Sequence, residues 1–138
     1  MATRSVTMTA STGTMTATAI QRGRVLRVTV LWISTAGGDA AGVLSDMYGL
    51  LRRIATVPDG GGTQPTNNYT LAVKGPGANL HSAANANTVG NEFSLSVADD
   101  GAAAYDAPLV SEDLTLTIAA AGNAKGGTVY LYFDLLDK

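Results

Sequence analysis

The chain has 138 residues, of which 46% are hydrophobic and only 14% are charged, against roughly a quarter in ordinary soluble domains. This length suits one domain with a sizeable core. A net charge of −2 and no basic run longer than Arg52-Arg53 argue against nucleic-acid binding, while the lack of cysteine excludes disulfides, thiolate chemistry and cysteine-ligated metals.

The amino-terminal residues do not have the pattern of a secretory signal peptide. They lack the basic region and apolar run of a secretory signal, and no apolar stretch is long enough to cross a bilayer. We therefore expect a chain that is made and kept in a cytoplasm, unless it leaves as part of a particle, and that has no membrane partner.

The first segment is rich in threonine. Residues 5–10 and 14–20 alternate Thr with small or apolar residues around a possible turn at Ser11-Thr12-Gly13. Because large residues are scarce, residues 1–23 are interpreted either as edge strands or as an extended arm that becomes ordered on a neighbour. Residues 24–138 are expected to form a single β-sandwich domain.

Residues 25–33 are the most apolar run and predict a core strand, with Val28, Val30 and Trp32 on one face. Glycine and aspartate in residues 34–42 predict a loop. Residues 43–57 fit either a helix or a strand. Gly49 and the β-branched finish favour one strand with a bend or bulge.

Alternation continues less regularly through the middle of the chain. Residues 69–73 and 92–97 predict strands, and Asp99-Asp100-Gly101 predicts a turn. Residues 78–91 are rich in Ala, Asn and Ser without a clear period, so they are interpreted as a long surface loop. Residues 102–111 are expected to run along the outside.

The stretch from Asp113 to Phe133 contains two alternating runs, residues 114–118 and 128–133, separated by a glycine-rich segment, which predicts a long hairpin. The second run has large residues on both faces and should be covered on both sides, as a central strand or one facing a partner would be. We expect the core and interface to include these residues: Trp32, Leu116, Tyr130, Leu131, Tyr132 and Phe133.

The pattern as a whole predicts an all-β protein. About six to eight strands separated by long Gly- and Asn-rich loops, with no convincing long helix, indicate an antiparallel β-sandwich or a barrel of jelly-roll-like form.

No constellation of residues predicts an enzyme, a cofactor or a metal site. His81, the only histidine, has no nucleophile elbow around Ser82, and a solvated or loop-anchoring role suits it better. The only glutamates, Glu92 and Glu112, lack a spaced carboxylate partner. Residues 99–101 with 112–113 do not form a recognisable calcium loop. The glycines of residues 60–62 and 75–77 lack the setting of a phosphate loop.

Tyr130 and Tyr132 could form a platform on which a sugar or base stacks. An interleaved basic patch is missing from the sequence around them, so packing is the preferred interpretation.

The order of several segments resembles a family of small structural proteins of tailed bacteriophages and prophages. The resemblance spans residues 24–133 and rests on turn motifs and strand order in these segments: 24–32, 34–42, 53–60, 64–71, 108–116 and 121–132. The resemblance implies a virion protein assembled in the host bacterial cytoplasm, namely a head decoration (cement) protein, with a neck or tail component as the alternative.

A capsid binder needs repeated weak contacts and an edge or arm that can join a neighbour, but no active site. The expected partners are the major capsid protein or other virion proteins, together with further copies of the chain in a homo-oligomer. A receptor- or carbohydrate-binding module is the competing class, and a small enzyme is disfavoured.

Overall fold

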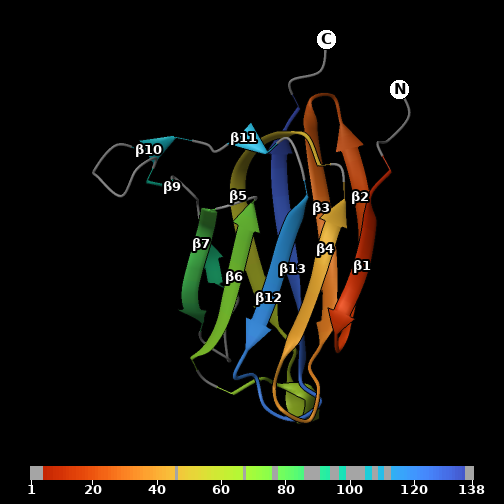
Figure 1. Ribbon diagram of the computed structural model, residues 1–138, viewed down its shortest axis with the longest axis vertical. Helices are drawn as coiled ribbons and strands as arrows, with labels where there is room; N and C mark the ends of the chain where they lie inside the picture. The colour runs from red at the N-terminus through yellow and green to blue at the C-terminus, as the bar shows by residue number, and fades with distance from the viewer. Residues whose placement is uncertain are drawn as a thin grey trace.

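The computed structural model is an antiparallel β-sandwich of two open sheets (Figure 1). It describes residues 5–45, 47–66, 68–75, 78–85, 91–93, 97–98, 105–106, 109–110 and 113–135, with the backbone alone for residues 78–109 among these. The all-β prediction and its sandwich alternative are confirmed. The sheets do not close into a barrel, because each ends in an edge strand.

Five strands form the first sheet, sheet A, in the order β1-β4-β12-β6-β7. Their neighbours are all antiparallel, and the sheet faces the viewer in Figure 1. The strands of sheet A are β1 (Thr7–Thr12), β4 (Ala40–Ser45), β12 (Leu114–Ala119), β6 (Tyr69–Gly75) and β7 (Ala78–Asn85).

The second sheet, sheet B, lies behind it in the order β11-β5-β13-β3-β2, and β8 pairs with β5 as well. The strands of sheet B are β2 (Thr14–Arg22), β3 (Val25–Ile33), β5 (Gly49–Pro58), β8 (Asn91–Phe93), β11 (Leu109–Val110) and β13 (Gly126–Asp134). A short ladder of β9 (Val97–Ala98) with β10 (Tyr105–Asp106) and a 3-10 turn, η1 (Gly61–Thr63), complete the elements.

The core fills the space between the two sheets. Val28, Val30 and Trp32 of β3 all point into it and are at most 2% exposed, as the alternation predicts. Trp32 of sheet B meets Tyr69 of sheet A with ring centroids 5.6 Å apart and a tilt of 42°. Burial raises the pKa of Tyr69 above its ordinary value, and a hydrogen bond with the Thr56 side chain opposes the rise.

The long hairpin predicted between residues 113 and 133 is wrong. Both runs are strands, but β12 lies in sheet A and β13 lies in sheet B, so they face each other across the core. The connection between them is an arch rather than a turn. The Ala121 N–H donates to the Gly38 carbonyl at 2.9 Å, and the Ala121 carbonyl accepts from the Thr66 N–H at 2.9 Å.

The single strand predicted over residues 43–57 is also wrong. The chain leaves sheet A after Ser45 and enters sheet B at Gly49, so β4 and β5 belong to different sheets. Gly49 begins a strand rather than bending one. Its φ of 149° suits glycine, and a Cβ there would lie 3.0 Å from the Asp134 carbonyl oxygen.

Three predicted loops and surface segments also need correction. The loop over residues 34–42 is shorter than expected, because β4 begins at Ala40. Residues 78–85 of the predicted surface loop form β7 and pair with β6, while residues 86–90 lie outside the described part of the chain. Residues 109–110 of the segment expected outside form β11, and Val110 is buried.

The described residues contain more strands than the roughly six to eight that the spacing predicts. The excess comes from splitting residues 43–57, from β7, and from the short strands β8 to β11. Small residues such as those of β7 satisfy a backbone ladder without the large apolar side chains that reveal a strand in sequence.

Candidate binding face on the outside of sheet B

The outer face of sheet B is unusually apolar for a surface that contacts solvent. We define this outer face by the outward residues of β2, β3, β13 and β5. Of the six large apolar side chains that are exposed in the described residues, five belong to it; only Tyr48 lies elsewhere. These five are Ile20 at 46%, Val25 at 48%, Leu31 at 53%, Ile33 at 50% and Val57 at 43% exposure.

The strand register explains why these side chains gather. On β3, Val28, Val30 and Trp32 occupy the inward positions, so the residues between them point outward. Because β2 and β13 pair with β3 in register, their outward residues form rows with those of β3. Leu31, for example, stands between Thr16 of β2 and Thr128 of β13.

Two arginines lie on two tyrosines at the centre of this outer face. The Arg27 guanidinium carbon is 5.4 Å from the Tyr130 ring centroid, and that of Arg53 is 5.2 Å from the Tyr132 centroid. In register, Tyr132 stands between Arg27 and Arg53, so Arg27 reaches diagonally to stack on Tyr130. Such stacking fixes a guanidinium and leaves its edge donors pointing away from the ring.

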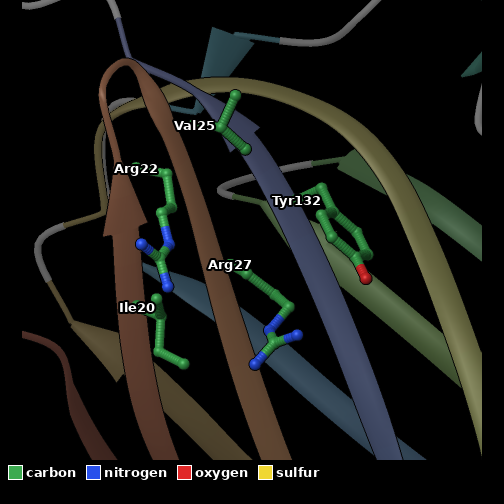
Figure 2. Close-up of a pocket in the computed structure, with 5 residues that line it drawn as sticks. All are labelled: Ile20, Arg22, Val25, Arg27 and Tyr132. Carbon is green, nitrogen blue, oxygen red and sulfur yellow. The ribbon is translucent and has the colours of Figure 1, made fainter.

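A shallow hollow of about 230 Å³ opens beside Arg27 on this outer face. Figure 2 shows Ile20 and Arg22 reaching into it from β2, Val25 and Arg27 from β3, and Tyr132 from β13. The Arg27 Nε is buried and has no hydrogen-bond partner among the residues that the structure describes. The hollow therefore joins an apolar rim to a cationic group with an unused donor.

An ion pair lies at one end of the same sheet. Arg52 of β5 contacts Asp134 of β13 at 3.1 Å, and both side chains are substantially exposed. Neither Arg22 nor Arg27 has a carboxylate partner within the described ranges. An exposed pair of this kind is worth at most about 1 kcal/mol.

The structure divides the predicted core and interface residues between two places. Trp32, Leu116, Leu131 and Phe133 lie in one core cluster between the sheets. Tyr130 and Tyr132 lie on the outer face, half-buried, and their strand β13 is central in sheet B, with β5 on one side and β3 on the other.

The sequence interpretation missed Arg27 and Arg53. The basic patch judged missing around Tyr130 and Tyr132 is present, because strand pairing brings the arginines from β3 and β5 to the tyrosines of β13. Each arginine occupies an outward position within an apolar run. From the alternation alone, both arginines could have been predicted to point outward from the sheet. Only the register shows which tyrosine ring each one contacts.

The other candidate residues do not converge on a site. His81 belongs to β7, opposite Val73, rather than to a loop. Residues 99–101 and Glu112 lie outside the described residues, and Asp113 is exposed. No group of three or more His, Cys, Asp or Glu side chains within the described ranges is placed to hold a metal ion. Nor does this part of the chain contain a helix long and apolar enough to cross a membrane.

Comparison of the chain with protein-family models, with curated proteins and with solved structures finds no match.

Proposed function

We propose that this chain is a non-enzymatic structural protein of a tailed-bacteriophage virion, and that it binds the head lattice as a decoration (cement) protein. The observation that carries the binding role is the set of five exposed apolar side chains on the outer face of sheet B. Exposed aliphatic side chains that gather on one face of a protein are typical of a protein-protein contact. The virion setting rests on the resemblance of residues 24–133 to small phage structural proteins.

The size of this outer face suits such a contact. Four strands about 4.8 Å apart and about nine residues long, at about 3.3 Å per residue, give it a flat area of roughly 600 Å². A stable, specific interface buries about 800 Å² on each partner. Side-chain relief adds to the flat area, so the face alone comes close to what one interface needs.

The composition of the outer face also suits a protein partner. Protein interfaces are enriched in tyrosine and arginine at their centres. Here Tyr130, Tyr132, Arg27 and Arg53 are central, with Ile20, Val25, Leu31, Ile33 and Val57 around them. A docked partner would remove the exposed aliphatic side chains from water. This burial contributes a favourable free energy of roughly 25 cal/mol for each Å² of apolar surface.

Two other functions remain as alternatives. A neck or tail component would use the outer face in the same way on a different virion partner. A receptor- or carbohydrate-binding module would need open aromatic rings for sugar stacking, whereas guanidinium groups already lie over Tyr130 and Tyr132. That stacking favours the protein-binding interpretation.

Co-sedimentation tests the proposal. The purified chain is mixed with empty capsids, with isolated tails and with host surface polysaccharide, all from the phage or prophage that encodes it and its host. Saturable binding to capsids is the expected result. Binding to tails alone would favour the neck or tail alternative, and binding to polysaccharide alone would favour the receptor module. No binding to any of the three would overturn the virion assignment.

Matched variants locate the contact. Leu31→Glu and Val57→Glu place a charge in the apolar part of the outer face and should weaken capsid binding at least about tenfold, because a charge must be desolvated on docking. Val43→Glu is the control, since Val43 is a partly exposed residue of β4 in sheet A. Equal weakening by all three variants would show that the outer face of sheet B is not the contact.

A further inference from the structure

The geometry points to the hollow beside Arg27 as a receptor for a carboxylate side chain, an Asp or Glu set among apolar residues on the surface of another protein. The inference rests on the proposed function in one respect, namely that the partner of the outer face is a protein. It adds the chemistry by which that partner is recognised.

The first argument is the state of Arg27. Its guanidinium lies over the Tyr130 ring, and its buried Nε has no hydrogen-bond partner within the described part of the chain. Because the protein itself covers the Nε, a docking acceptor would meet the outer nitrogens of this partly exposed guanidinium. A carboxylate is the acceptor that matches the planar fork of a guanidinium with two parallel hydrogen bonds.

The second argument is the placing of Arg22. It lines the same hollow from the neighbouring strand β2, and Figure 2 shows its guanidinium and that of Arg27 extending away from Val25. Two cations beside one hollow repel each other unless an anion lies between them. One carboxylate there could accept from both arginines.

The third argument is the apolar rim. Ile20 and Val25 flank the arginines and remain about half exposed. If a partner covers them, they exclude water from the ion pair, and its electrostatic attraction becomes stronger in the lower dielectric. The partner's carboxylate must therefore have apolar neighbours that cover this rim.

Other occupants fit the outer face less well. A second copy docked face to face about a two-fold axis would bring arginines against arginines. A nucleic acid would meet a chain of net charge −2, and an exposed aliphatic rim contributes nothing to phosphate binding.

The direct test uses two peptides and the full-length chain. The Arg Nε–Hε resonances are followed by NMR during titration with acetyl-Leu-Glu-Leu-amide, and separately with acetyl-Leu-Gln-Leu-amide at equal ionic strength. The glutamate peptide should shift the Arg27 resonance saturably, whereas the glutamine peptide should not. Equal shifts with both peptides, or none with either, would overturn the inference.

Two further experiments test a second copy of the chain and a nucleic acid as occupants of the outer face. In sedimentation of the chain alone, any self-association should be the same for wild type and for Arg27→Gln. A short DNA duplex should not shift the Arg27 resonance at physiological salt. An Arg27-dependent dimer or a saturable DNA shift would overturn the assignment of a carboxylate-bearing partner.

Capsid binding by arginine variants then tests the same inference. Losing one member of a desolvated charge pair costs at least about 2 kcal/mol, so Arg27→Gln should weaken capsid binding about thirtyfold or more. Arg22→Gln should weaken it less, because Arg22 is exposed. Lys74→Gln, which removes the same charge from an exposed residue of β6 in sheet A, is the control and should change binding by less than about threefold.

The outcomes separate the inference from the proposed function. If capsids bind wild type and Arg27→Gln equally, the virion proposal stands and the carboxylate receptor is wrong. If capsids do not bind but the glutamate peptide selectively shifts Arg27, the receptor stands and the virion assignment is wrong. Melting temperatures of all variants confirm that each is folded before its binding is compared.

Discussion

Adjacent residues of one strand have opposite roles in this protein. Trp32 fills the core while Leu31, its neighbour on β3, is 53% exposed on the outer face of sheet B. Phe133 on the adjacent strand β13 is fully buried. The strand pleat alone produces this contrast, so a substitution at one position tests stability and the same substitution next to it tests binding.

Trp32→Ala and Phe133→Ala should each lower the free energy of unfolding by about 3–5 kcal/mol, because both leave a cavity between the sheets. Urea unfolding and thermal melting measure the loss. Leu31→Ala is the matched control and should cost less than about 1 kcal/mol. A loss from Leu31→Ala as large as that from Trp32→Ala would mean that the outer face is part of the folding core.

Tyr69 should make stability fall at high pH. Burial raises the pKa of Tyr69 above 10.0, so the folded state holds the phenolic proton at a pH where the unfolded chain releases it. The stability from this group is complete below pH 10 and is lost as pH rises through the folded-state pKa. Urea unfolding at pH 8 and pH 11 measures the loss. Tyr69→Phe should show a smaller loss between these two values than wild type, and an unchanged loss would contradict the prediction.

At the scale of elements, the first two strands form a corner between the sheets. β1 is the edge of sheet A and β2 is the edge of sheet B, and Gly13 alone separates them (Figure 1). Gly13 has φ of 63°, and a Cβ there would lie 2.5 Å from the Ile33 carbonyl oxygen. The chain can therefore cross from sheet A to sheet B at this point only because residue 13 has no side chain.

Gly13→Ala should destabilise the fold more than Gly23→Ala. Both glycines have a left-handed φ, which costs about 1–2 kcal/mol for alanine. At Gly23 a Cβ would meet nothing within 4 Å, whereas at Gly13 the backbone must move. Urea unfolding of the two variants gives the comparison. Equal losses would show that the corner at Gly13 relaxes without strain.

Deleting residues 1–10 should leave the isolated fold nearly intact while weakening assembly. Thr7 to Ala10 pair with β4, but no side chain of residues 5–12 is buried; Val6 and Met8 only pack partly against the core. The deletion should therefore lower the melting temperature much less than Phe133→Ala does, and it should weaken capsid co-sedimentation. If the deletion unfolds the protein as badly as Phe133→Ala, the segment is an integral core strand.

At the scale of the whole molecule, sparse charge and an apolar outer face suit a protein that works in contact with others. Only 14% of residues are charged, and Tyr130 and Tyr132 give β13 large groups outside the core as well as inside it. β1 and β2 end their sheets within the described residues, and such edges can accept a further strand.

Through these edges, rather than through the outer face of sheet B, the protein should be a homo-oligomer, or become one when it is arrayed on a lattice. Analytical ultracentrifugation over a wide concentration range, followed by stoichiometry on capsids, measures this. A chain that stays monomeric at every concentration and binds neither capsids nor tails would contradict the prediction.

Local pattern alone determined the class of fold and much of the core. The alternation in residues 25–33, 114–118 and 128–133 places Trp32, Leu116, Leu131 and Phe133 on inward faces, because a strand's period of two is a property of the strand itself. The absence of cysteine and the scarcity of charge are likewise readable without a structure.

Only the tertiary structure decided which strands are neighbours. An alternating run has the same pattern whether it pairs with the next run or faces it across the core, so the predicted hairpin of β12 and β13 could not be told from the arch that joins two sheets. The meeting of Arg27 with Tyr130 and of Arg53 with Tyr132 depends on the same long-range pairing. The candidate face therefore became visible only when the register of β3, β13 and β5 was known, because the register is set by contacts between residues far apart in the chain.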